Sequence, residues 1–202
     1  MVLELTGDKR RLAKKRKIPE GLTEAARQTR ARFLEERARF LKRRESISLS
    51  VLVWGQNPKF PSEVSKKRRQ IRQELIELGH YVVFSEELAV EGAYVSQKVD
   101  ELAQAHAADV IIALIEDAPG ALGETHEFGP YPDIAPKFFV LAPTRYQQDY
   151  SGLGILRDLP GYGRVHWYKP PDLKACRVLE AAVHHVEAIR NHMFCQNKLG
   201  AS

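Results

Sequence analysis

The chain has 202 residues, of which 44% are hydrophobic and 28% charged, and its formal net charge at pH 7 is +5. This length and balance predict one main folded domain with an appendage, and they exclude a wholly disordered chain. The longest apolar run, VIIALI at 110–115, is far too short for a membrane span, so we expect no membrane partner.

The N-terminus and the cysteines indicate where the protein works. No apolar stretch of signal-peptide length follows the first charges, so we expect a cytoplasmic protein. Cys176 and Cys195 are the only cysteines, too few for a disulfide framework or a cysteine-only zinc site. We expect neither a bound metal nor a cofactor.

Residues 1–46 form a predicted basic helical arm, with 15 Lys/Arg against 7 Asp/Glu. The charged run KRRLAKKRK at 9–17 has little to bury and predicts a tail that is mobile or becomes ordered on a partner. Thr23 can cap a helix that reaches about Arg44. Within this helix RARFLEE at 30–36 is echoed by RARFLKR at 37–43, which places two Phe-Leu pairs on one stripe.

The apolar stripe of the arm needs a partner surface, which the sequence leaves open between the body, a second copy and another protein. A homo-oligomer is therefore expected. The basic residues between 9 and 44 also suit a nucleic acid or a nucleoprotein.

From residue 47 onward, strand patterns alternate with helix patterns. We predict strands at 46–54, 81–84, 109–116, 137–143 and 164–168, and helices at 62–79, 96–107 and 172–193. This alternation predicts an α/β domain over 47–202: a doubly wound, mainly parallel five-stranded sheet in flavodoxin-like order. Ligands of such sheets bind beyond the carboxyl ends of the strands.

Three loops leave those carboxyl ends, and the third, EDAPGALGETHEFG at 116–129, holds the most acids. Pro119 and Gly120 turn the chain off the most apolar strand, and helix-forming residues follow. Glu124 should then lie in the first turn or so of a helix, with Glu127 one step further on the same face. Both carboxylates could be catalytic, or could merely oppose the helix dipole.

The stretch 117–129 resembles a known site motif: an apolar strand, an aspartate, Pro-Gly-x-x-x-Glu, then an acid and Phe. It is similar to that of the nucleoside 2-deoxyribosyltransferase-like family, which includes TIR-like nucleotide N-glycosidases of antiphage systems such as retrons. Similarity of pattern covers about residues 47–170. The resemblance implies that Glu124, four residues after Gly120, is the nucleophile. Glu127, four residues after Gly123, competes for that role in a second register.

The resemblance also implies substrate contacts. Asp117 would contact the base or sugar, Gly55, Gln56 and Asn57 would line the ligand from the first loop, and Asp100 matches an upstream acid. Tyr94 and Trp54 could stack on a base or pack in the core or rim.

The implied reaction is cleavage of the N-glycosidic bond of a nucleotide, with NAD or a nucleoside monophosphate as substrate. A carboxylate beneath the sugar can stabilise or capture the anomeric carbon as positive charge develops there. Asp117 or Glu127 could protonate the departing base. Water as acceptor gives hydrolysis and a second base gives transfer, and the resemblance implies a toxic antiphage effector. The alternatives are a nucleotide sensor, or a docking protein that acts through its arm.

Overall fold

The computed structural model describes residues 23–88, 96–147, 156, 159 and 164–199. Tyr94 and the predicted tail at 9–17 lie outside these residues. The chain divides into two compact units, Met1–Lys42 and Arg43–Ser202.

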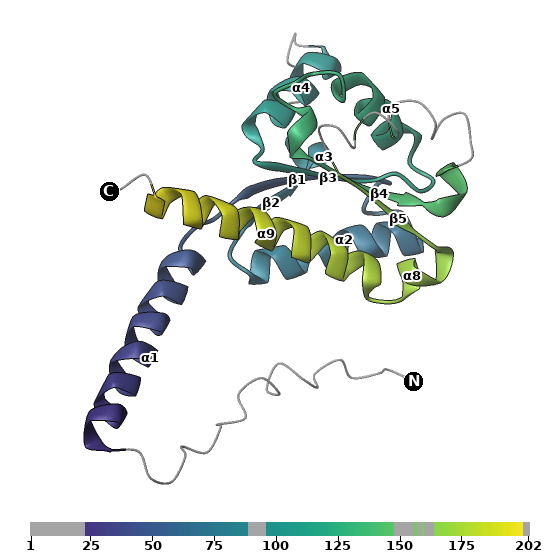
Figure 1. Ribbon diagram of the computed structural model, residues 1–202. Coiled ribbons are helices and arrows are strands. Elements are labelled where there is room, and N and C mark those ends of the chain that lie inside the picture. The colour runs from purple at the N-terminus through teal and green to yellow at the C-terminus, as the bar shows by residue number, and fades with distance from the viewer. Residues whose placement is uncertain (1–22, 89–95, 148–155, 157–158, 160–163, 200–202) are drawn as a thin grey trace. The chain divides into compact units, whose positions relative to one another are not determined.

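The second unit is built on one parallel sheet of five strands (Figure 1). Their order across the sheet is β2-β1-β3-β4-β5, which confirms the predicted doubly wound fold with flavodoxin-like order. The strands are β1 (Ser50–Trp54), β2 (Tyr81–Phe84), β3 (Val110–Leu114), β4 (Phe138–Pro143) and β5 (Arg164–Tyr168). Val51 is in register with Val82 on one side and with Val110 on the other.

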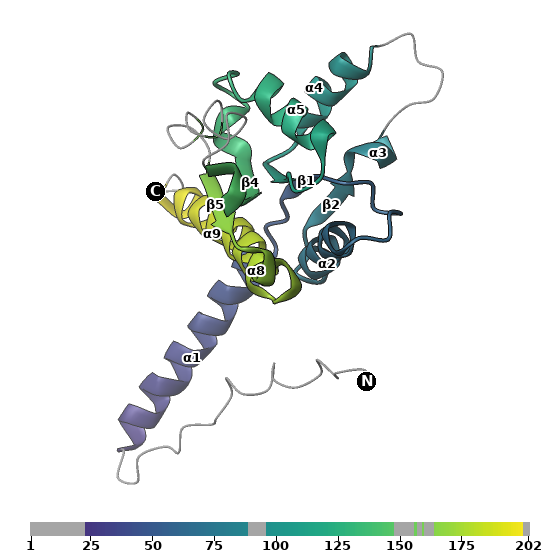
Figure 2. The ribbon, with the colours of Figure 1, turned by 90° about the vertical axis from the view of Figure 1, so that its right-hand side faces the viewer.

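Helices cover both faces of the sheet (Figures 1 and 2). One layer contains α2 (Glu63–Glu77), α8 (Pro170–Lys174) and α9 (Arg177–Leu199); the other contains α4 (Gln97–Ala107) and α5 (Pro119–Phe128). The short elements are α3 (Ser85–Leu88), η2 (Ala135–Lys137) and η3 (Thr144–Gln147). Successive residues of β1 serve different layers, since Val51 and Val53 belong to the core under α2 and α9, whereas Leu52 and Trp54 belong to the core under α4 and α5.

Local sequence accounts for the start of the helices around the carboxyl edge. The Ser62 hydroxyl accepts from Ser65 N at 3.1 Å and caps α2, and the Ser96 hydroxyl accepts from Val99 N at 3.4 Å and caps α4. Pro119 opens α5, where a missing N–H is harmless. These starts match the predicted positions to within a residue or two.

Two predicted elements differ in the structure. The predicted C-terminal helix is two helices, because the Ala175 backbone is extended and its carbonyl accepts from the buried Lys67 ammonium at 3.0 Å. The predicted strand at 46–54 begins only at Ser50. The short helix α3 after β2 was not predicted at all.

A buried polar cluster fastens α9 to the strands at the edge opposite the loops. His80 Nδ1 accepts from Leu49 N at 3.2 Å, and its Nε2 lies 2.9 Å from Glu187 Oε1. Burial lowers the pKa of His80, which fits a neutral ring that donates to the glutamate. Arg44 and Arg190 also pair with Glu187. The cluster lies beside the N-terminal ends of the strands, where it stabilises the fold.

The helix α1 (Glu24–Glu45) begins as predicted, with Ala26 N donating to the Thr23 hydroxyl at 3.3 Å. None of its residues is buried. The predicted stripe is exposed, with Phe33 67% and Phe40 42% accessible, and it includes Leu34 and Leu41. None of the described helices is both long and apolar enough to cross a membrane.

Candidate active site

A cavity of about 470 Å³ lies at the carboxyl edge of the sheet, where the chain leaves β1 for β2 on one side and later returns to β3 on the other. Among the described residues, its wall includes residues 55–57 after β1, Ser85 and Glu86 of α3, four polar residues of α4, and residues 117–121 with Glu124. This is the switch point of strand order, where ligands bind in sheets of this kind. The volume suits a small organic molecule.

Glu124 is the acid of this cavity that the protein perturbs most. The pKa of its carboxyl is raised to about 7, mainly by burial and also by the negative charges of Glu101 and Glu86, while Arg68 lowers it. Near neutral pH the carboxyl therefore exchanges between its ionised and protonated forms. Such a group can serve as a nucleophile or as a proton carrier.

Glu124 lies deeper in its helix than the sequence pattern indicated. Because α5 already begins at Pro119, Glu124 is the sixth residue and the first turn holds no acid. The favourable effect of a helix dipole on an acid fades after the first turn. A favourable interaction with the helix dipole therefore does not explain why a glutamate stands at position 124.

Asp117 lines the same cavity and has a left-handed backbone, with φ of 50°. Arg145 holds the turn from the far side: its Nη2 is 3.1 Å from Asp117 Oδ1 and its Nη1 is 3.0 Å from Glu116 Oε1. The Tyr168 hydroxyl donates to Glu116 Oε2 at 2.7 Å. Residues from η3 and β5 thus fix the strained turn that leads from β3 into α5.

Glu127 has different surroundings from Glu124. Its carboxylate pairs with Lys98 of α4, and it is not among the described residues that line the cavity. Between the two registers of the motif, the geometry therefore favours Glu124.

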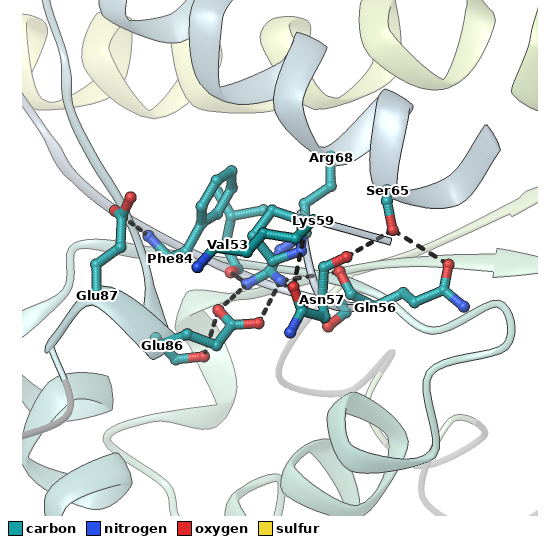
Figure 3. A network of polar contacts seen from close by, with 12 residues as sticks. Val53, Gln56, Asn57, Lys59, Ser65, Arg68, Phe84, Glu86 and Glu87 are labelled. Atoms are coloured by element: carbon teal, nitrogen blue, oxygen red, sulfur yellow. Dashed lines mark hydrogen bonds and ion pairs between the residues drawn. The ribbon is translucent and has the colours of Figure 1, made fainter. Parts of the chain in front are cut away.

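The loop after β1 passes close to the end of β3. A Cβ on Gly55 would lie 3.1 Å from the Leu114 carbonyl oxygen and 3.3 Å from Arg68 Cδ, so a side chain there would push the loop away. Gln56 accepts hydrogen bonds from the hydroxyls of α2's first turn, and Asn57 Oδ1 accepts from Lys59 N at 2.9 Å (Figure 3). Both polar side chains thus shape the loop, besides lining the cavity.

Arg68 was missed by the sequence interpretation, although it organises one wall of the cavity (Figure 3). Its guanidinium is fully buried and makes two bonds to Glu86, of 2.6 and 2.7 Å. It also donates to the carbonyls of Val53, Gly55 and Gln56. The sequence carried a signal, because an arginine four residues after Val64 and three before Ile71 lies on the buried stripe of α2.

The remaining predicted residues are placed as follows. Asp100 lines the cavity and accepts from Gln104 Nε2 at 3.0 Å; Glu101 of the same helix, also missed, accepts from Gln97 Nε2 at 2.7 Å. Gly120 lines the cavity but has open space at its Cβ position. Tyr94 is not described. Trp54 is fully buried against Phe128 and Phe138, so it is a core residue and does not stack on a base.

No family model matches the chain, and no curated protein matches it significantly. Among the described residues no group of three or more His, Cys, Asp or Glu side chains is arranged to hold a metal ion.

Proposed function

We propose that the protein cleaves the N-glycosidic bond of a nucleotide or nucleoside, with Glu124 as the nucleophile. The observation that carries this proposal is the half-buried Glu124 carboxyl, which faces a cavity of nucleoside size with its pKa raised to about 7. A carboxylate in this position can approach a sugar from below as the bond to the base breaks. NAD and nucleoside monophosphates are the first substrates to test.

The other residues of the cavity have supporting roles in this reaction. Ionised Glu124 stabilises the developing oxocarbenium ion or captures it as a covalent ester. Asp117, which lines the same cavity from the turn before α5, contacts the sugar or the base. Water then releases the sugar, or a second base accepts it.

The direct test is incubation of the full chain with NAD, nucleoside monophosphates and the matching nucleosides, followed by chromatography of the released base. We expect free base from at least one substrate. Adding a different free base distinguishes transfer from hydrolysis. Binding without any base release would instead indicate a nucleotide sensor and would refute the enzymatic proposal.

A second candidate function belongs to α1, which has eight Lys/Arg against four Glu, and whose Phe33 and Leu34 are exposed. Arginines interleaved with aromatic residues suit a nucleic acid, because they can neutralise phosphates while the rings contact bases or sugars. We propose that this helix docks the protein on RNA or a nucleoprotein.

For the arm, we expect affinity for structured RNA to fall steeply as salt rises. Replacing Arg30 and Arg37 together by glutamine should reduce the slope of log K against log salt by about 1 to 2, since each phosphate contact contributes about one counterion. Lys174→Gln, on α8, is the matched control and should leave the slope unchanged. If the affinity for RNA does not change with salt concentration, docking of the arm on nucleic-acid phosphates would be contradicted. A protein would then be the favoured partner of the arm.

A further inference from the structure

The described wall of the cavity carries negative charge on four of its five elements, all except the loop after β1. Carboxylates reach it from α3, α4, the turn after β3 and α5, and the described lining contains no lysine, arginine or histidine. These five acids are Glu86, Asp100, Glu101, Asp117 and Glu124. Their mutual repulsion is felt at Glu124, whose pKa is raised partly by Glu101 and Glu86.

Three cations on the elements around this wall already have partners. Arg68 is fully buried and bonded to Glu86 and to three backbone carbonyls. Arg145 pairs with two acids of the turn, and Lys98 pairs with Glu127. Among the residues that the structure describes, a phosphate in the cavity would find no unpaired cationic side chain in the lining, but the partial positive charge of the α5 N-terminus, which has no side-chain cap. Even with Glu86 and Asp117 paired to arginines, the charges of Asp100, Glu101 and ionised Glu124 outweigh that partial charge.

We propose that the cavity selects a nucleoside that lacks phosphate and whose base carries a positive charge, such as an N-alkylated purine or a pyridinium riboside. This inference rests on the proposed N-glycosidic cleavage and narrows its substrate. A 5′-phosphate would bring two further negative charges into an acidic cavity. A cationic base instead offsets the repulsion among the acids.

The chemistry of bond cleavage fits the same substrate. The described wall contains no histidine, cysteine, tyrosine or lysine to hand a proton to a departing base, and a cationic base needs no such proton. In a cationic nucleoside both electrons of the C1′–N bond pass to the nitrogen and cancel its charge, so the base leaves neutral without a proton. Glu124 captures C1′, water then displaces the carboxylate, and the water's second proton is released to solvent.

The selectivity can be measured without turnover, using carbocyclic ribosides that cannot be cleaved. One pair compares carbocyclic nicotinamide riboside with its 5′-phosphate, and the other compares it with its uncharged dihydro form, which has nearly the same shape. We expect calorimetric Kd values at low salt to favour the phosphate-free cation by at least about tenfold in each pair. Glu101→Gln should shrink both ratios by about threefold or more, whereas Glu74→Gln, outside the cavity lining, should leave them unchanged.

Equal or tighter binding of the phosphorylated or uncharged member would overturn the inference. A parallel assay of base release from nicotinamide riboside and N7-methylguanosine separates this failure from failure of the proposed function. Base release combined with tighter binding of the phosphorylated compound would support the proposed N-glycosidase activity. It would refute the inferred preference for phosphate-free substrates. Selective binding of the cation with no base release from any substrate would refute the proposed cleavage reaction. It would still support the inferred selectivity of the cavity for phosphate-free cations.

Discussion

Replacing Glu124 by glutamine should lower base release by about a thousandfold or more, because an amide can neither capture C1′ nor neutralise the charge that develops there. The measurement is the rate of base release under saturating substrate, followed by chromatography. Glu127→Gln is the matched control on the same helix. Since Glu127 pairs with Lys98 and is not among the described lining residues, its variant should stay within about threefold of wild type.

The Glu124→Gln variant should be more stable than wild type at high pH. The pKa of Glu124 is raised from 4.5 to about 7 in the folded protein, so folding favours the protonated carboxyl. Ionised Glu124 therefore costs stability progressively as pH rises from about 4.5 through 7, and glutamine removes that cost. We expect a gain of about 1–2 kcal/mol at pH 8 and none at pH 4.5, measured by urea unfolding.

The wild-type rate of base release should rise with pH and level off above about 7, since only the ionised carboxylate is a nucleophile.

In the comparison of the two glutamine variants, loss of activity in Glu127→Gln with full activity in Glu124→Gln would assign the nucleophile to the second register. Equal activity in all three proteins would refute a carboxylate nucleophile on α5.

Replacing Arg68 by methionine should destabilise the protein by about 2–3 kcal/mol, measured by urea unfolding at pH 7. The guanidinium supplies donors to three backbone carbonyls at the end of β1, and methionine leaves them without these bonds. Glu86 also loses its cationic partner while it remains in the lining of a cavity that holds other acids. Its partial exposure, 42% of the side chain, keeps the loss below that of a fully buried pair.

Activity should respond in a way that loss of packing alone would not produce. Because the charge of Arg68 lowers the pKa of Glu124, its removal should move the rise of base release to higher pH. Arg72→Met is the matched control. Arg72 lies one turn further along α2, its guanidinium lies over the Phe84 ring as that of Arg68 does, and it pairs with Glu87 at the surface. We expect it to cost less than about 1 kcal/mol and to leave the pH profile unchanged. A similar loss in both variants would contradict the role assigned to Arg68.

The sequence by itself determined the fold of the second unit. Five strand patterns alternate with helix patterns, and the resulting parallel sheet directs the loops after β1, β2 and β3 to one edge. The third of those loops carries Glu124 and Asp117, and the resemblance to a known site motif added Asp100 from the preceding helix; all three line one cavity. Helix starts at Ser62 and Ser96 were equally readable, because a cap acts on backbone groups only two or three residues away.

Only the tertiary structure decided the electrostatics of the cavity. Arg68 and Glu86 are 18 residues apart and meet because α2 and α3 pack at the same sheet edge, a contact that no local pattern encodes. The separation of Glu124 from Glu127 depended on where α5 begins and on the reach of Lys98 from another helix. Charge and desolvation at a site sum over side chains that are distant in sequence, so the raised pKa of Glu124 and the acidic wall around it appear only once the chain is folded.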